Sequence, residues 1–124
     1  YNPDLAEARL NLGIACAQMG DLAEAITQLQ DLVRRRPAMP EAQANLGIAL
    51  AEAGRVDEAI VAYAEALRLR PDYAVAHYNL GNALVARQRW AEARRHFAEA
   101  VRLAPDFAAA RAMLERLQFV PDVP

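Results

Sequence analysis

The chain has 124 residues, a formal net charge of −2 and a single cysteine, Cys16. The length suits one domain, and the interspersed charges give no basic footprint for nucleic acid or an anionic membrane. One cysteine excludes an internal disulfide framework, and no apolar run approaches the ~20 residues that span a bilayer. The composition is rich in Ala, Leu and Arg and poor in Gly, which favours helix almost throughout.

A 34-residue period organises the chain. Prolines mark it at Pro3, Pro37, Pro71 and Pro105. The triplet Asn-Leu-Gly recurs in phase at residues 11–13, 45–47 and 79–81. Self-similarity at this spacing is typical of repeat architectures, in which each unit buries its apolar face against the next unit.

The helices are predicted to come in pairs. Small and apolar residues spaced by three and four predict amphipathic helices at 5–19, 22–35, 39–53, 56–69, 73–87, 90–103 and 107–119. Gly20-Asp21 and Gly54-Arg55 separate the members of the first two pairs, because Gly adopts the left-handed conformation that ends a helix. Gln88-Arg89 replaces Gly in the third pair, so this turn should be less ideal, with Trp90 as its anchor.

The helix ends carry further signals. Asp4, Asp72 and Asp106 each follow a period-marking proline, and we expect their carboxylates to cap the next helix. In the second repeat, Pro40 takes the first helical turn, which tolerates proline. Tyr1 has the phase of a helix end, so we expect a preceding helix and interpret the chain as a piece of a longer protein.

These residues resemble the tetratricopeptide repeat, a helix-turn-helix unit of 34 residues. The Leu-Gly pair of its first helix is present at 12–13, 46–47 and 80–81. The second-helix pattern of Ala, aromatic, Ala and terminal Pro is present at Ala59, Tyr63, Ala66 and Pro71, and again at Ala93, Phe97, Ala100 and Pro105. The first repeat departs from the pattern, since Leu29 and Leu32 replace the aromatic and the second small residue.

The resemblance implies an all-α fold, an α-solenoid forming a right-handed superhelix of seven helices. As one domain over 1–124, it would hold repeats at about 4–37, 38–71 and 72–105, a capping helix at about 106–119 and a tail at 120–124. The first helix of each repeat would lie on the concave side. In the capping helix, Glu115 and Gln118 occupy columns that elsewhere face a second helix, so we expect them to face solvent.

The candidate binding residues are those of the concave face that do not pack. They are Asn11, Asn45, Asn79, Asn82, Ile48, Tyr78, Met113 and Arg116. The asparagine column could pair with the backbone of an extended peptide, because an amide presents both a donor and an acceptor. A similar asparagine ladder holds substrate chains in the tetratricopeptide domains of O-linked N-acetylglucosamine transferases. The alternative is that these amides only satisfy neighbouring helix ends or waters.

Apolar residues would form the floor of this groove, namely Leu10, Ile14, Ile48, Tyr78 and Met113. Leu10 and Ile14 could instead pack laterally between adjacent first helices. Glu52 and Ala86 lie on the same predicted face. The clamp that holds acidic chaperone C-termini in some family members is not expected, because only Asn45 matches its residue set.

The sequence offers no catalytic constellation. His77 is expected in the seam between helices and His96 on the outer helix surface, with no cysteine or carboxylate at metal-ligand spacing. Cys16 is expected to be a buried small hydrophobe rather than a nucleophile. We therefore expect no catalytic residue, no metal site and no cofactor.

The arginine-rich stretches at 34–36 and 87–95 suggest a nucleic-acid patch at first sight. Acidic neighbours dilute them, namely Asp31, Glu92 and Glu99. A solvated outer face is therefore expected, with neither nucleic acid nor a membrane as a partner.

The sequence predicts a non-enzymatic protein–protein interaction scaffold that takes an extended peptide or a helix of a partner protein in its concave groove. One alternative is a substrate-recruiting arm of a larger enzyme, such as a glycosyltransferase. Another is a homo-oligomer that assembles through exposed solenoid ends, because the first helix leaves Ala8, Leu12 and Ala15 partly uncovered.

Overall fold

The computed structural model describes residues 3–119, with side chains from Leu5 onward. The regular elements of this range are seven helices: α1 Pro3–Gln18, α2 Leu22–Arg35, α3 Pro40–Glu52, α4 Val56–Leu69, α5 Ala74–Ala86, α6 Trp90–Leu103 and α7 Ala108–Leu117. The expectations for Tyr1 and for the tail at 120–124 lie outside the described residues. The fold is the expected all-α solenoid of helix-turn-helix units.

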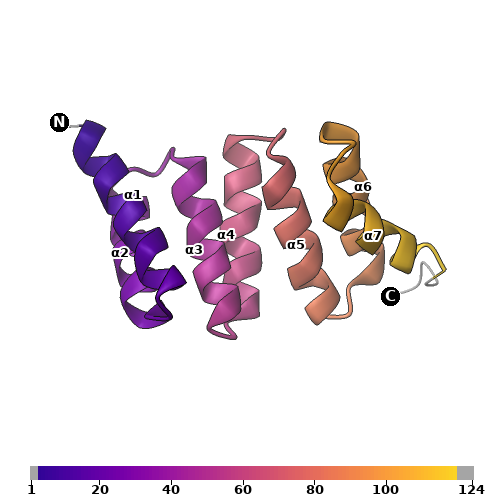
Figure 1. Cartoon of the computed structure of the whole chain (residues 1–124), viewed down its shortest axis with the longest axis horizontal. Coiled ribbons are helices and arrows are strands. Elements are labelled where there is room, and N and C mark those ends of the chain that lie inside the picture. Colours follow the sequence, from indigo (N-terminus) through magenta and orange to yellow (C-terminus); the bar gives the residue numbers. More distant parts are fainter. Residues whose placement is uncertain (1–2, 120–124) are drawn as a thin grey trace.

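The helices form two layers (Figure 1). The first-helix layer contains α1, α3, α5 and α7, and the second-helix layer contains α2, α4 and α6. Each helix packs against its sequence neighbours, so α2 lies against both α1 and α3, and α4 against both α3 and α5. The helices α2, α4 and α6 have the predicted bounds, whereas α3 and α5 are one residue shorter at each end.

A glycine in each first helix lets the two helices of a pair approach closely. The partners are Gly13 with Leu29, Gly47 with Tyr63 and Gly81 with Phe97. A Cβ on Gly47 would lie 2.5 Å from Cε1 of the Tyr63 ring, closer than real Cβ contacts. Since Leu29, Tyr63 and Phe97 are all buried, these contacts form the centre of the core.

The turns within pairs follow the expected chemistry. Gly20 has a φ of +85° and Gly54 a φ of +83°, which glycine adopts without a Cβ clash. The third turn uses Gln88 at a φ of +60°, so a residue with a Cβ occupies the left-handed region there. Trp90 follows this turn and packs, half-buried, against the core as its expected anchor.

The predicted aspartate caps are wrong for two helices. The N-cap of α5 is Tyr73 and that of α7 is Phe107, and neither makes a side-chain cap hydrogen bond. Asp72 and Asp106 lie one residue too early, because the Tyr73 and Phe107 N–H groups close a turn that precedes each helix. Asp4 also differs, since α1 already begins at the residue before it.

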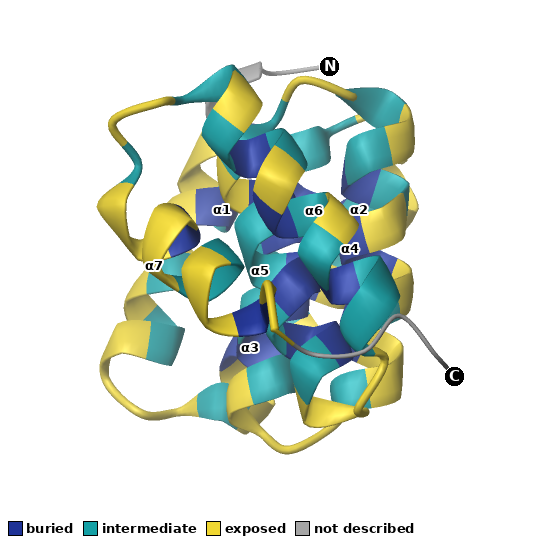
Figure 2. Cartoon of the chain, turned by 90° about the vertical axis from the view of Figure 1, so that its right-hand side faces the viewer, coloured by how far each residue is buried: buried dark blue, intermediate teal, exposed yellow. Residues whose placement is uncertain are grey.

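The capping helix α7 presents its outer side to solvent (Figure 2). Both Glu115 and Gln118 are exposed, as their columns predicted. A polar face at this end of the stack needs no further helix to cover it, which is what a terminal cap of a solenoid requires.

Candidate functional site

A cavity of about 290 Å³ lies between α3 and α5, with α4 beneath it. We call it the α3–α5 pocket. Its lining residues are Ile48, Ala51, Glu52, Val56, Tyr63, Asn79, Asn82, Ala83 and Ala86. The structure thus brings together three of the predicted groove residues, Ile48, Asn79 and Asn82, each on a helix of the first-helix layer.

The asparagines of the pocket keep their hydrogen-bonding groups available. Asn79 and Asn82 are half-buried, and neither side-chain amide is hydrogen-bonded to another residue within 3–119. They lie three residues apart on α5, so both project toward the same side of that helix. The pocket therefore offers two amides, each with donor and acceptor capacity.

Tyr63 and Glu52 complete the polar set of the pocket. Burial raises the pKa of the Tyr63 hydroxyl, and the nearby Glu52 carboxylate raises it further. The hydroxyl is therefore protonated at neutral pH and can donate a hydrogen bond. The ring of Tyr63 lies beneath Gly47, where a larger residue would clash with it.

The asparagine column is not uniform. Asn45 donates from Nδ2 to the backbone oxygen of Glu41, one turn earlier in α3, over 2.8 Å. One of its donors is therefore used within its own helix. Asn11 is exposed on α1 and lies outside the α3–α5 pocket.

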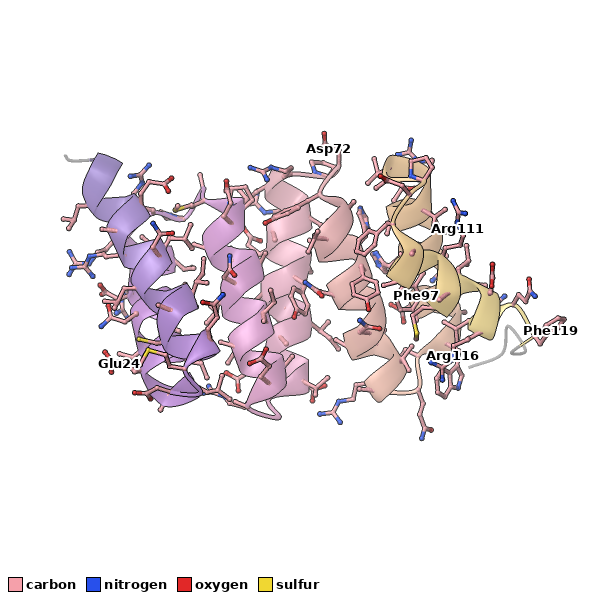
Figure 3. All side chains as sticks on the ribbon, in the orientation of Figure 1. Glu24, Asp72, Phe97, Arg111, Arg116 and Phe119 are labelled. Atoms are coloured by element: carbon pink, nitrogen blue, oxygen red, sulfur yellow. The ribbon has the colours of Figure 1, made fainter. Side chains whose placement is uncertain are left out.

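The remaining predicted groove residues gather around α7. The Tyr78 ring packs on Phe107, with centroids 4.9 Å apart, and on Phe97 at 5.9 Å. Met113 is half-buried against the core, and its sulfur accepts a 3.7 Å hydrogen bond from Nη1 of the exposed Arg116. Figure 3 shows Arg116 on α7, at the C-terminal end of the stack. None of these three residues lines the α3–α5 pocket.

The predicted apolar floor is partly wrong. Leu10 is buried in the core, and Ile14 is half-buried against it. Leu10 is therefore unavailable to a ligand, and lateral packing is the correct interpretation of its position. The reason is that α1 also lies against α3, so a side chain between these two helices is buried.

Two other expectations need correction. His96 does not lie on the outer surface, because its ring is half-buried and stacks on His77 with centroids 5.3 Å apart. Cys16 is half-buried rather than buried, although its counterparts Leu50 and Leu84 are almost fully covered. Within 3–119, no group of three or more His, Cys, Asp or Glu side chains could hold a metal ion.

The arginines of the two basic stretches are largely paired. Arg34 and Arg35 both bind Asp31, Arg87 binds Asp57 and Arg89 binds Glu92. Asp31 is shared, because it also binds Arg9 of α1. Along the described part of the chain, no helix has the length and apolar character needed to cross a membrane.

Two groups of the pocket have no binding role in the sequence-based prediction. Tyr63 was identified only as the aromatic residue of the second-helix pattern, and Glu52 was placed on the concave face without a role. The signal for Tyr63 was Gly47, because a residue without a side chain lets the α3 backbone lie directly against an aromatic ring. Glu52 adds a carboxylate at the rim of the same cavity.

Solved structures with this fold include two peptide complexes. The first tetratricopeptide domain of Spaghetti (RPAP3), bound to an HSP90 peptide, has a TM-score of 0.90 at 22% identity, covering 94% of this chain and 92% of that one. The Yersinia enterocolitica secretion chaperone SycD, in complex with a YopD peptide, has a TM-score of 0.87 at 20% identity, covering 94% of both chains.

A region of a larger enzyme is similar as well. An O-GlcNAc transferase from Thermobaculum terrenum has a TM-score of 0.86 at 27% identity over 94% of this chain, but the match spans only 23% of that enzyme. No match was found among curated proteins. Family models described as tetratricopeptide repeat match residues 1–38, 10–74 and 50–117. The chain therefore belongs to the tetratricopeptide repeat family.

Proposed function

We propose that this chain is a non-enzymatic scaffold that binds an extended peptide or a partner's helix across its first-helix layer, centred on the α3–α5 pocket. The repeats at 4–37, 38–71 and 72–105, with the cap at 106–119, would act as one binding unit. The observation that carries the proposal is the pair Asn79 and Asn82, half-buried at a cavity and without a side-chain hydrogen bond within 3–119.

The pocket suits a peptide better than a cofactor. Small-molecule sites occupy roughly 300–1,000 Å³, so a cavity of about 290 Å³ has room for little more than one side chain. The walls from Ile48, Val56 and Ala83 are apolar and would cover that side chain. The asparagine amides beside it would pair with the backbone of the same peptide, whatever its sequence.

The charge of the pocket restricts the ligand. Glu52 is its one charged lining residue, and it would repel an acidic side chain. The acidic chaperone peptide that RPAP3 binds is therefore a poor candidate for this chain. We expect neutral or basic residues in the part of the peptide nearest to Glu52.

The test uses random-sequence peptides displayed on phage, selected on the intact chain. Selected peptides are titrated against the wild type and the Asn79→Ala/Asn82→Ala variant. We expect the double variant to lose roughly tenfold or more in affinity. Its fold should be retained, since Ala favours helix and no described hydrogen bond is lost.

Two matched controls separate the alternatives. Gln30→Ala removes an exposed amide from α2 in the second-helix layer and should leave binding unchanged. Asn11→Ala removes the equivalent amide outside the pocket. If Asn11→Ala also loses affinity, the peptide contacts the asparagines of all the repeats rather than the pocket alone. Equal affinity of the wild type and the double variant would refute the proposal.

A specific observation favours self-association as a second candidate. Leu5 and Leu12 are exposed on α1, beside a cavity of about 520 Å³ formed by α1 and α2. Such an uncovered solenoid end could stack on a second copy. Light scattering over a dilution series would exclude this idea if the chain stays monomeric at the highest concentration.

The similarity to a region of an enzyme favours the alternative that this chain recruits substrates for a larger enzyme. Because the O-GlcNAc transferase match spans 23% of that protein, a domain like this one can serve as part of a larger enzyme. The reading frame around this sequence decides the point. A glycosyltransferase domain encoded next to it would support a substrate-recruiting role, and its absence would oppose one.

A further inference from the structure

The only two histidines of the chain meet between α5 and α6. His77 is buried and His96 half-buried, and their Nδ1 atoms lie 3.0 Å apart. The Nε2 atom of His77 lies 2.9 Å from the backbone oxygen of Pro71, in the turn between α4 and α5. The two rings thus join this turn, α5 and α6 through two hydrogen bonds.

The Pro71 oxygen fixes where the protons lie. A carbonyl oxygen only accepts, so Nε2 of His77 must carry hydrogen and donate to it. In the neutral His77 ring, Nδ1 is then bare and accepts a hydrogen bond from Nδ1–H of His96. Both contacts are satisfied when both rings are neutral.

The pair tolerates one added proton but not two. A first proton can bind Nε2 of His96 and leave the Nδ1–H···Nδ1 bond unchanged. A second proton must bind Nδ1 of His77, where it faces the Nδ1–H of His96 over 3.0 Å. Two donors and two positive charges would then oppose each other, and the rings would have to separate.

The surroundings of His96 favour its neutral form. Burial lowers the pKa of His96, and the neighbouring His77 lowers it further. The charged groups acting on His96 all lie on its own helix: Glu92 and Glu99 oppose this shift, and Arg95 adds to it. Beside His96, the groove is lined from α4 by Ile60, Ala64 and Leu67, which carry no charge. Arg89 and Glu92 also line it, and these two charged groups form an ion pair with each other.

We propose that the His77–His96 pair is a pH-sensitive latch, which ties the α4–α5 turn to α5 and α6 at neutral pH and opens when both rings are protonated. The direction in which stability changes with pH follows from the linkage between protonation and folding. A histidine that is harder to protonate when folded contributes stability above its unfolded pKa, and this stability is lost as the pH falls through that value. Acidification should therefore loosen the α5–α6 pair before the α1–α2 pair.

The second repeat provides a control for the latch. In the columns of His77 and His96 it carries Gln43 and Ala62, both buried. The variant His77→Gln/His96→Ala copies a pairing that already folds within this chain and contains no histidine. Any pH dependence that it retains between pH 5 and 8 must come from other groups.

The experiment is denaturant unfolding of both proteins from pH 8 to pH 5, with a chelator present. We expect the unfolding constant of the wild type to rise roughly tenfold more than that of the variant on acidification. Nitrogen NMR should find hydrogen on Nε2 of His77 and on Nδ1 of His96 at pH 8. The proposal would be overturned if the unfolding constants of the two proteins changed in parallel with pH. Two histidines that titrate like exposed ones would also overturn it.

A single variant covers the case in which the double variant fails to fold. His96→Gln keeps a side-chain amide able to donate to Nδ1 of His77 but removes the second titrating ring. It should unfold like the wild type at pH 8 and lose most of the additional pH dependence. A His96→Gln protein as acid-sensitive as the wild type would equally refute the latch.

Discussion

The first and third helical pairs fill the same sequence columns but differ in how far they are covered. Leu12 of α1 and Leu80 of α5 are equivalent in the 34-residue period, yet Leu12 is 48% exposed and Leu80 only 5%. The helix α4 lies against α5, whereas within the described residues α1 has helices on its other sides only (Figure 1). Burial of this column therefore depends on a preceding pair.

The same two pairs also satisfy a polar column differently. Arg9 of α1 forms an ion pair with Asp31 of α2, with Nη1 and Oδ2 2.5 Å apart. The equivalent His77 of α5 pairs with His96 of α6 and with a backbone oxygen. The glycines that recur with the 34-residue period thus set the spacing between the helices of a pair. The hydrogen-bond and ion-pair partners of the polar side chains differ from one repeat to the next.

The largest expected difference lies in the shared leucine column. Leu80→Ala should cost about 2–5 kcal/mol of unfolding free energy, because it leaves a cavity in the core. Leu12→Ala should cost about 1 kcal/mol or less, because half of that side chain already contacts water. Denaturant unfolding of the two variants measures both values. Equal losses would show that α1 is covered in solution, for example by a second copy.

Overpacking at the glycines should show a smaller difference. Gly81→Leu would drive a side chain into the rigid Phe97 ring and should cost about 1–3 kcal/mol. Gly13→Leu should cost less, because α1 can move outward from Leu29 on its open side. Thermal unfolding followed by circular dichroism measures the two losses of stability. A larger loss for Gly13→Leu would contradict the view that α1 can move more easily than α5.

The smallest effects concern the turns. Gln88→Gly should stabilise the chain by about 0.5–1 kcal/mol, because glycine removes the Cβ strain of the left-handed conformation at some entropic cost. The reciprocal change Gly20→Gln should destabilise it by about 1–2 kcal/mol. If both variants unfold like the wild type, the two turns do not hold these conformations in solution.

Much of the fold follows from local signals in the sequence. Helices α2, α4 and α6 were predicted with their observed bounds, because Gly or Gln turns precede them and Pro-marked turns follow. The Leu-Gly pairs and the aromatic residues Tyr63 and Phe97 were likewise identified from the repeated pattern. These features depend on neighbours along the chain, which a sequence displays directly.

The features that the sequence did not predict depend mostly on how the helices are oriented relative to each other. His77 and His96 are 19 residues apart, and their contact requires the relative orientation of α5 and α6. The aspartate caps were predicted wrongly for a local reason, because a turn over residues 70–73 includes Asp72 and α5 starts one residue later than expected. At the candidate site, Asn79 and Asn82 could be predicted, but their meeting with Tyr63 from α4 could not.

We propose that the α3–α5 pocket in the first-helix layer is the binding site of this chain. It is tested most directly by an NMR titration of the isotope-labelled chain with a phage-selected peptide, following every backbone amide. We expect the largest shifts at 48–56 and 79–86, and we expect the Asn79→Ala/Asn82→Ala variant to need roughly tenfold or more peptide for the same shifts. Shifts confined to α2, α4 and α6, or to the open side of α1, would contradict it.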